Sequence, residues 1–118
     1  MQKQINVKNL VASISISLLL VGCSTKDFFQ TVNDYNHSQR TIDQIELLME
    51  GITPSKPYQT VGVVSTYYSN STIPKESLQL MRELAVEKGL DGVYDIHYAP
   101  MGTQSAGGCN GKGFVYTK

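Results

Sequence analysis

Three side chains near the C-terminus could bind a metal ion or activate a thiol. Asp95 and His97 lie two residues apart in the segment 93–99, a spacing that puts both side chains on one face of a β-strand. Cys109 follows in a glycine-rich stretch that returns the chain toward that strand. The three residues offer oxygen, nitrogen and sulfur ligands, which suit a soft metal ion or zinc. They also contain a Cys–His pair, the minimum for chemistry by a nucleophilic thiolate.

The alternative for this trio is two polar side chains on a solvated strand face and an unreactive thiol in a glycine loop. Metal and catalytic sites normally show tighter spacing and a second set of residues that orient the ligands. The spacing therefore favours the alternative, and the trio remains a candidate metal site.

Tyrosines form a second candidate site, for a protein partner. Six of the seven tyrosines lie between Tyr58 and Tyr116, and tyrosine is enriched at protein interfaces. An exposed patch would be the first place to look for a partner; the alternative is the edge of the core. The residues of this predicted patch are Tyr67, Tyr68, Tyr94 and Tyr98.

The N-terminal segment has the pattern of an export signal. Lys3 and Lys8 precede an apolar run over residues 10–21, interrupted only by serines. A helix needs about 20 apolar residues to span a bilayer. The run is shorter than that, and its length fits the hydrophobic region of an export signal.

The end of the apolar run, Leu20-Val21-Gly22-Cys23, resembles a bacterial lipobox. The resemblance implies diacylglyceryl transfer to the Cys23 thiol, cleavage after Gly22 and acylation of the new amino terminus. Two or more acyl chains give stable anchoring without a membrane-spanning helix. In Gram-negative lipoproteins an Asp after the cysteine favours the inner membrane, so Ser24 implies the outer membrane. The alternative is an ordinary signal or anchor that happens to contain a cysteine.

Length, charge and composition limit the remaining possibilities. The chain has 118 residues, with 10 Lys and Arg against 10 Asp and Glu, so it has no strongly basic face for nucleic acid. Hydrophobic residues make up 41% and charged residues 17%, which is typical of a folded chain. Two cysteines exclude a disulfide-dense scaffold. Removal of residues 1–22 leaves 96 of the 118 residues, enough for one domain.

Hydrophobic periodicity divides the chain into four parts. We expect a lipoprotein signal peptide over 1–22, a lipidated tether over 23–37, an N-terminal helix and linker over 38–56, and a βαββ domain over 57–118. Ile42, Ile45, Leu48 and Met49 recur with helical spacing and predict a helix over 38–51, which Gly51 would end.

The predicted fold class is α+β: a small βαββ domain with one main helix packed on a three-stranded sheet, preceded by a helical N-terminal segment. The helix is expected over 75–88, followed by Gly89 in a left-handed conformation. The strands are expected near 60–68, 93–99 and 113–118, with a loop over 102–111. The helical residues expected against the sheet are Leu78, Met81, Leu84 and Ala85.

Three pieces of the chain carry a resemblance to a known family: Thr60-Val61-Gly62-Val63-Val64, LMRELAVEKGLDGVYDIHY over 80–98, and GKGFVY over 111–116. Residues 57–118 resemble the βαββ domain shared by YbjQ-like heavy-metal-binding proteins and the outer-membrane stress-sensor lipoproteins of the Rcs system. The resemblance implies the fold and allows self-association. The stress sensor uses disulfides within its domain, whereas this chain has only Cys23 and Cys109.

The expected function is that of a lipid-anchored cell-envelope protein at the outer membrane, facing the periplasm. We expect a non-catalytic protein-interaction or envelope-sensing module, with no enzyme activity, no cofactor and no nucleic-acid partner. Its expected partners are the membrane, through the anchor, and an envelope protein or a second copy of the chain. The alternatives are a periplasmic metal-binding domain that uses Asp95, His97 and Cys109, and a structural homo-oligomer.

Overall fold

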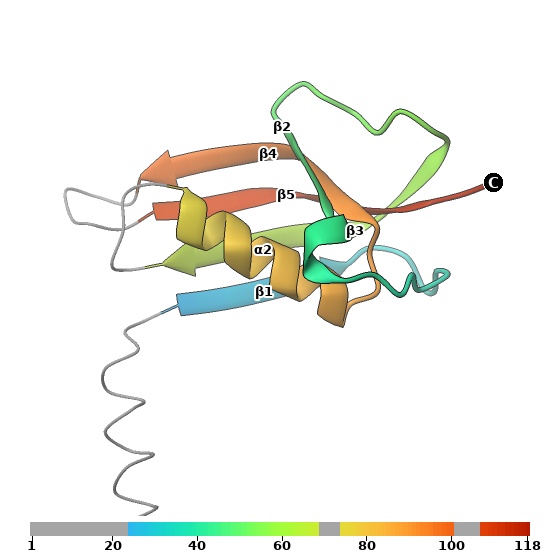
Figure 1. Cartoon of the computed structure of the whole chain (residues 1–118), viewed down its shortest axis with the longest axis horizontal. Helices are drawn as coiled ribbons and strands as arrows, with labels where there is room; N and C mark the ends of the chain where they lie inside the picture. Colours follow the sequence, from blue (N-terminus) through green and yellow to red (C-terminus); the bar gives the residue numbers. More distant parts are fainter. Residues whose placement is uncertain (1–23, 69–73, 101–106) are drawn as a thin grey trace, which may run out of the picture.

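The protein is a five-stranded sheet with one long helix packed on one face (Figure 1). The computed structural model describes residues 24–68, 74–100 and 107–118. The strand order is β1-β3-β5-β4-β2, in which the first four strands are antiparallel neighbours and β2 runs parallel to β4. The elements are β1 (Ser24–Gln30), a 3₁₀ turn η1 (Ile42–Gln44), β2 (Glu46–Met49), β3 (Tyr58–Tyr68), α2 (Lys75–Glu87), β4 (Gly92–Pro100) and β5 (Gly107–Tyr116).

The helix α2 matches the prediction closely. It begins at Lys75 and ends at Glu87, one residue before the expected end. Met81, Leu84 and Ala85 are buried against the sheet, as the helical spacing predicts. Gly89 has a φ of 68°, which confirms the expected left-handed ending, since only glycine adopts this conformation without strain.

The glycine-rich stretch before the C-terminus is a strand, and the predicted loop over 102–111 is wrong from Gly107 onward. Residues 102–106 lie outside the described part of the chain. A Cβ atom at Gly111 would lie 2.7 Å from Val93, and one at Gly113 would lie 2.9 Å from Leu90. These glycines therefore let the core side chains approach the backbone of β5, which occupies the middle of the sheet.

Two β-bulges change which side chains share a face. In β4, Tyr94 opposes Lys112 and His97 opposes Asn110, so two residues, Asp95 and Ile96, lie opposite one residue of β5. Asp95 adopts a φ of 53° at this bulge. Ile96 is buried in the core, whereas Tyr94 and His97 lie on the other face. Strict alternation along the strand, without the bulge, would place Tyr94 on the same face as Ile96 and Tyr98. A second bulge lies at Val61, between Thr60 and Gly62 of β3.

The predicted helix over 38–51 is wrong. Its residues form the short turn η1 and then the strand β2, which pairs with β4. Ile45 is buried, but Ile42 and Met49 are 40% and 42% exposed, so the helical stripe of apolar residues does not face the core. The unpaired edge of β4 offers backbone hydrogen bonds to this segment, and that tertiary interaction overrides local helix propensity.

The predicted tether over 23–37 is also wrong for most of its first half. Ser24–Gln30 form β1, which pairs with β3 along its whole length and makes one edge of the sheet. Phe28 packs against the core from this strand. The fold class is therefore corrected from a three-stranded βαββ unit with a helical N-terminal segment to a five-stranded mixed sheet with one helix. The predicted signal peptide over 1–22 and the predicted lipidation site Cys23 lie outside the described residues.

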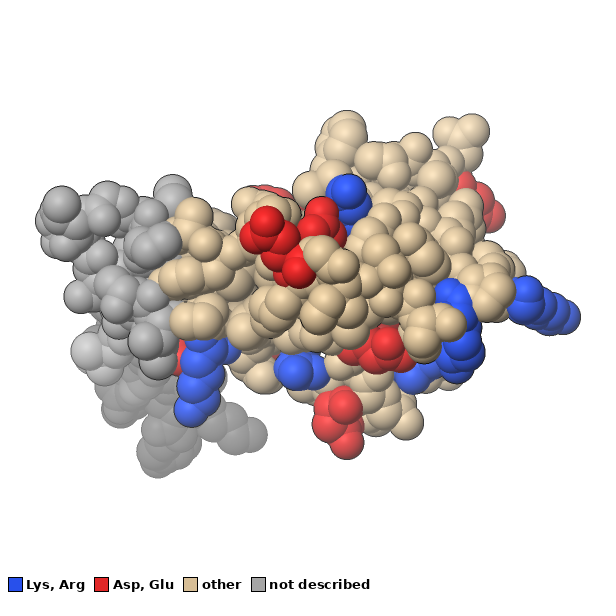
Figure 2. Space-filling model, turned by 90° about the horizontal axis from the view of Figure 1, so that it is seen from above, with Lys and Arg blue, Asp and Glu red and all other residues tan. Residues whose placement is uncertain are grey.

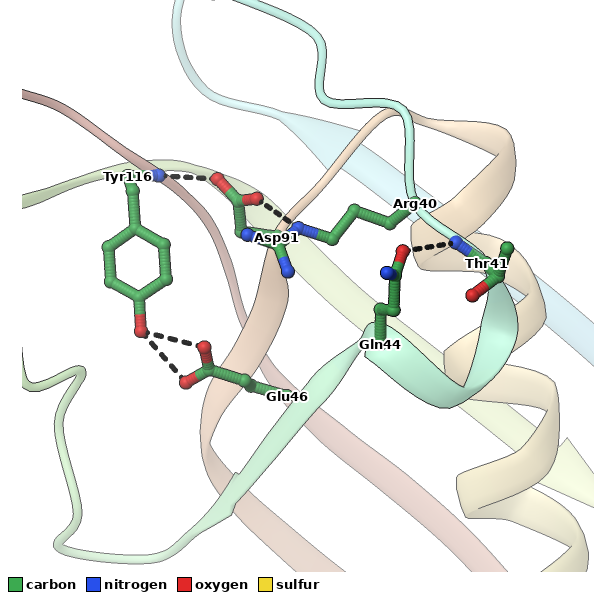
Figure 3. A network of polar contacts seen from close by, with 6 residues as sticks. All are labelled: Arg40, Thr41, Gln44, Glu46, Asp91 and Tyr116. Carbon is green, nitrogen blue, oxygen red and sulfur yellow. Dashed lines mark hydrogen bonds and ion pairs between the residues drawn. The ribbon is translucent and has the colours of Figure 1, made fainter.

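A buried carboxylate, Asp91, joins the N-terminal segment to the rest of the fold (Figure 3). Its Oδ1 accepts a hydrogen bond from Arg40 Nε at 2.6 Å, and its Oδ2 accepts one from the Tyr116 amide at 2.6 Å. The Asp91 carbonyl accepts the Glu46 amide at 3.1 Å. Tyr116 in turn donates its hydroxyl to the Glu46 carboxylate at 2.8 Å. This network fixes β2 and the preceding segment to β4 and β5.

The end of α2 is the second point at which the N-terminal segment binds. The Tyr35 hydroxyl donates to the Lys88 carbonyl at 2.6 Å, and the Ser38 amide donates to the Gly89 carbonyl at 2.7 Å. These carbonyls have no partner within the helix ladder, so the segment satisfies them. The segment is thereby part of the folded domain.

The network around Asp91 gives a stability prediction. Arg40→Met leaves a carboxylate with a 5% exposed side chain without its cation, and we expect a loss of about 1.5–3 kcal/mol in the free energy of unfolding. Lys26→Met is the matched control, because Lys26 forms exposed ion pairs with Glu83 and Glu87 and should cost about 1 kcal/mol or less. Urea unfolding measures both; equal losses would contradict the role given to Asp91.

Candidate functional site

The face of the sheet opposite α2 is the candidate site, and we call it the helix-free face. Strand register aligns its side chains in rows across β1, β3, β5 and β4. Phe29 and Val63 are cross-strand partners on this face and are 72% and 44% exposed. One row is Phe29, Val63, Lys112 and Tyr94; the next is Asp27, Ser65, Asn110 and His97.

Two shallow hollows lie next to each other on this face, along β5. One has a volume of about 250 Å³ and the other about 200 Å³, and Asn110 lines both. Gly108 has no side chain and Asn110 has a short one, whereas the larger side chains of Tyr67 on β3 and His97 on β4 flank them. The helix-free face is therefore hollowed along the middle strand. The lining residues of the larger hollow are Val63, Asp95, His97, Asn110, Gly111 and Lys112.

Charged groups gather around Asp95 at the rim of the larger hollow. Asp95 Oδ1 accepts the Gly51 amide at 3.2 Å and lies 3.5 Å from His97 Nε2. Lys112 Nζ lies 3.6 Å from Asp95 Oδ2. The hydrogen bond from the Gly51 amide is the main cause that holds the pKa of Asp95 below its usual value, and His97 and Lys112 add to it. Asp95 is therefore an ionised acceptor at neutral pH.

The predicted metal ligands do not converge. His97 Nδ1 lies 3.1 Å from Glu50, while Nε2 faces Asp95, so the imidazole sits between two carboxylates. Cys109 is buried in the core, whereas His97 is on the helix-free face. Within 24–68, 74–100 and 107–118, no group of three metal-ligating residues is present. The described geometry therefore brings together only Asp95 and His97 of the predicted trio.

Cys109 is an unreactive thiol in its folded environment. It is 1% exposed, and burial raises the pKa of the thiol to about 11. Thiolate, the nucleophilic form, is therefore scarce at neutral pH.

This burial gives a reactivity prediction. In the full chain carrying Cys23→Ser, we expect Cys109 to resist iodoacetamide at pH 8 in buffer and to react fully in denaturant. The matched control adds Cys109→Ser and Asn110→Cys, which moves the thiol to an exposed neighbouring position. Mass spectrometry measures the adduct; equal labelling rates for the folded Cys109 and the control thiol would contradict the burial.

The four tyrosines of the predicted patch are divided between the two faces. Tyr67 and Tyr94 lie on the helix-free face, and Tyr68 and Tyr98 on the face that carries α2. Tyr94 is 8% exposed, and the Tyr98 hydroxyl is buried without a hydrogen-bond partner among the described residues. The four side chains therefore do not form one surface.

An aromatic cluster, which the sequence analysis did not predict, covers the other end of this face. Tyr94 and Tyr116 each pack edge-on against Phe114, which is fully buried. Tyr58 contacts both Tyr94 and Phe114. Burial, with the hydrogen bond to Glu46, raises the pKa of Tyr116 to about 12. This end of the helix-free face is closed, so its accessible part lies between Phe29, Val63 and the two hollows.

Phe29 and Val63 are site residues that sequence reasoning missed. Phe29 lies in the segment 23–37 that the sequence predicts as a tether, and Val63 lies in the predicted strand over 60–68 without being a candidate site residue. In a strand, neighbouring side chains face opposite sides of the sheet. Of the two adjacent phenylalanines in the segment Asp-Phe-Phe-Gln, only Phe28 therefore packs against the core, and Phe29 faces outward. That alternation was the available signal.

Comparisons with known proteins bear on the fold. No family model matches the chain, and no curated protein sequence matches it. The crystal structure of the Francisella virulence factor FvfA is similar in fold, with a TM-score of 0.52 and 12% sequence identity. The similarity covers 77% of this chain and 97% of that one. No helix in the described part of the chain is long and apolar enough to cross a membrane.

Proposed function

We propose that this protein is a lipid-anchored envelope lipoprotein, held at the outer membrane and facing the periplasm, that binds a protein partner without catalysing a reaction. The observation that carries the proposal is the sequence pattern of two lysines, an apolar run over 10–21 and the lipobox-like Leu20-Val21-Gly22-Cys23, which is typical of a lipoprotein export signal. The folded domain supports it, because its first strand begins at Ser24, the residue after the proposed acylation site.

The helix-free face is the surface proposed for the partner. Phe29 and Val63 are large exposed apolar side chains next to each other, flanked by the polar groups of Asp27, Ser65 and Lys112. An apolar centre with a polar rim is the usual composition of a protein-binding surface. Membership in the family of Rcs-type stress-sensor lipoproteins remains a proposal that rests on the sequence resemblance.

The anchor gives the first prediction of function. Cells fed a clickable palmitate analogue should label the wild-type protein and not the Cys23→Ser variant. Cys109→Ser is the matched control and should keep its label, because the second cysteine is buried in the core. Mass spectrometry of the purified protein should find acyl groups on an N-terminal Cys23. An unmodified Cys23, or label that survives Cys23→Ser, would contradict the proposal.

The binding face gives the second prediction. A photo-crosslinking amino acid at Ser65, on the helix-free face, should form an adduct with one discrete envelope protein. Phe29→Lys should abolish that adduct without unfolding the domain, because Phe29 is 72% exposed. A crosslinker at Gln79, exposed on α2, is the control for the opposite face and should give no such adduct. Identical adducts from both faces, or an adduct insensitive to Phe29→Lys, would contradict the assignment.

A further inference from the structure

One end of the sheet follows directly on the proposed acylation site. Strand register places Ser24, Tyr68, Gly107 and Pro100 side by side across β1, β3, β5 and β4, and we call these residues the terminal row. Figure 1 shows β1 starting at the end of the sheet where the arrows of β3 and β4 finish. Consecutive Cα atoms are about 3.8 Å apart. Ser24 is therefore one residue from Cys23 and is already paired with Tyr68.

This geometry leaves no length of free chain between anchor and domain. A flexible tether over 23–37 would have a root-mean-square span of about 20 Å. A headgroup layer is about 5–8 Å thick on each side of the bilayer. Such a tether would hold the domain clear of the lipids, whereas the pairing of Ser24 places the terminal row within about one headgroup thickness of the anchor.

The residues at this end are suited to contact with lipid headgroups. The terminal row and the row behind it contain no charged side chain. Two of the eight residues are tyrosines, whose rings favour the membrane–water interface. The first turn of α2 adds Lys75 and Glu76, one charge of each sign. The row behind the terminal row is Thr25, Tyr67, Gly108 and Ala99.

The opposite end of the sheet combines the aromatic cluster with charged side chains. From Tyr68 to Tyr58, β3 extends over about 33 Å. Around Tyr58 lie Tyr116, with Lys56 4.6 Å from its ring, and the network of Arg40, Asp91 and Glu46. Figure 2 shows most of the visible Lys, Arg, Asp and Glu side chains over the middle and right of the view, with further charged atoms beside the grey residues on the left. The two ends therefore differ in charge, and the end next to the proposed anchor is the less charged one.

We propose that the end of the sheet carrying the terminal row faces the bilayer that holds the acylated Cys23, so that the strands point away from the membrane. This orientation rests on the proposed acylation of Cys23. It places the helix-free face upright beside the bilayer and the aromatic cluster at the far end. The partner that this end of the sheet faces is the phospholipid headgroup layer.

Tryptophan quenching tests the orientation, because the chain contains no tryptophan. Tyr68→Trp and Ala99→Trp each place an indole in the terminal row or the row behind it, and Thr117→Trp places one at the far end as the matched control. Each acylated full-length variant is purified from membranes and reconstituted in phosphatidylethanolamine–phosphatidylglycerol vesicles. The vesicles contain or lack phosphatidylcholine with a nitroxide on its headgroup, and circular dichroism checks that each variant is folded.

We expect the nitroxide lipid to remove most of the emission of Tyr68→Trp and Ala99→Trp and to leave that of Thr117→Trp unchanged. Equal quenching of all three variants, or none, in protein that mass spectrometry shows to be acylated would overturn the orientation and leave the proposed function standing. Absence of acyl groups on Cys23 would overturn both. Two variants at the membrane end keep the test decisive if one of them fails to fold.

Discussion

The buried carboxylate of Asp91 is the constraint on which the arrangement of the chain depends. Asp91 lies between the end of α2 and the start of β4, and its two oxygens bind Arg40 and the Tyr116 amide. Its own backbone binds Phe114 and Glu46. Burying a charge is unfavourable unless it is paired and hydrogen-bonded, so these segments must assemble together. The consequence is that residues 38–49, which were predicted to belong to a separate helix and linker over 38–56, become part of the domain.

The two faces of the sheet differ because β5 carries different residues on each. Toward α2 it presents Cys109, Gly111, Gly113 and Val115, which pack closely with the core. On the other face it presents Gly108, Asn110 and Lys112, where the surface is hollowed. The same strand therefore builds the core and the open face. It also separates Cys109 from Asp95 and His97, which is why the three do not form a metal site.

The sequence predicted α2 well because its signals are local: Pro74 at the start, an apolar stripe, and Gly89 at the end. The strands β3, β4 and β5 were also located, but the side-chain facing of β4 depends on the bulge at Asp95, which no local pattern marks. The edge strands β1 and β2 were missed because their identity comes from pairing with β3 and β4. Of the candidate site, the sequence identified Asp95, His97 and Tyr67, whereas Phe29 and Val63 became visible only once β1 was known to be a strand.

The most direct test of the account is hydrogen exchange of β1 in the acylated protein bound to vesicles. The Thr31 amide donates to the Val61 carbonyl at 2.9 Å. In an antiparallel pair every second residue of a strand donates its amide to the partner strand. The amides of Thr25, Asp27 and Phe29 therefore also donate to β3, whereas the amides between them point to the free edge. The account predicts slow exchange for the amides of Thr25, Asp27 and Phe29, and fast exchange for those of Lys26, Phe28 and Gln30 at the free edge. Exchange of all six at the rate of an unstructured chain would make the segment a tether and contradict a domain that begins at its membrane anchor.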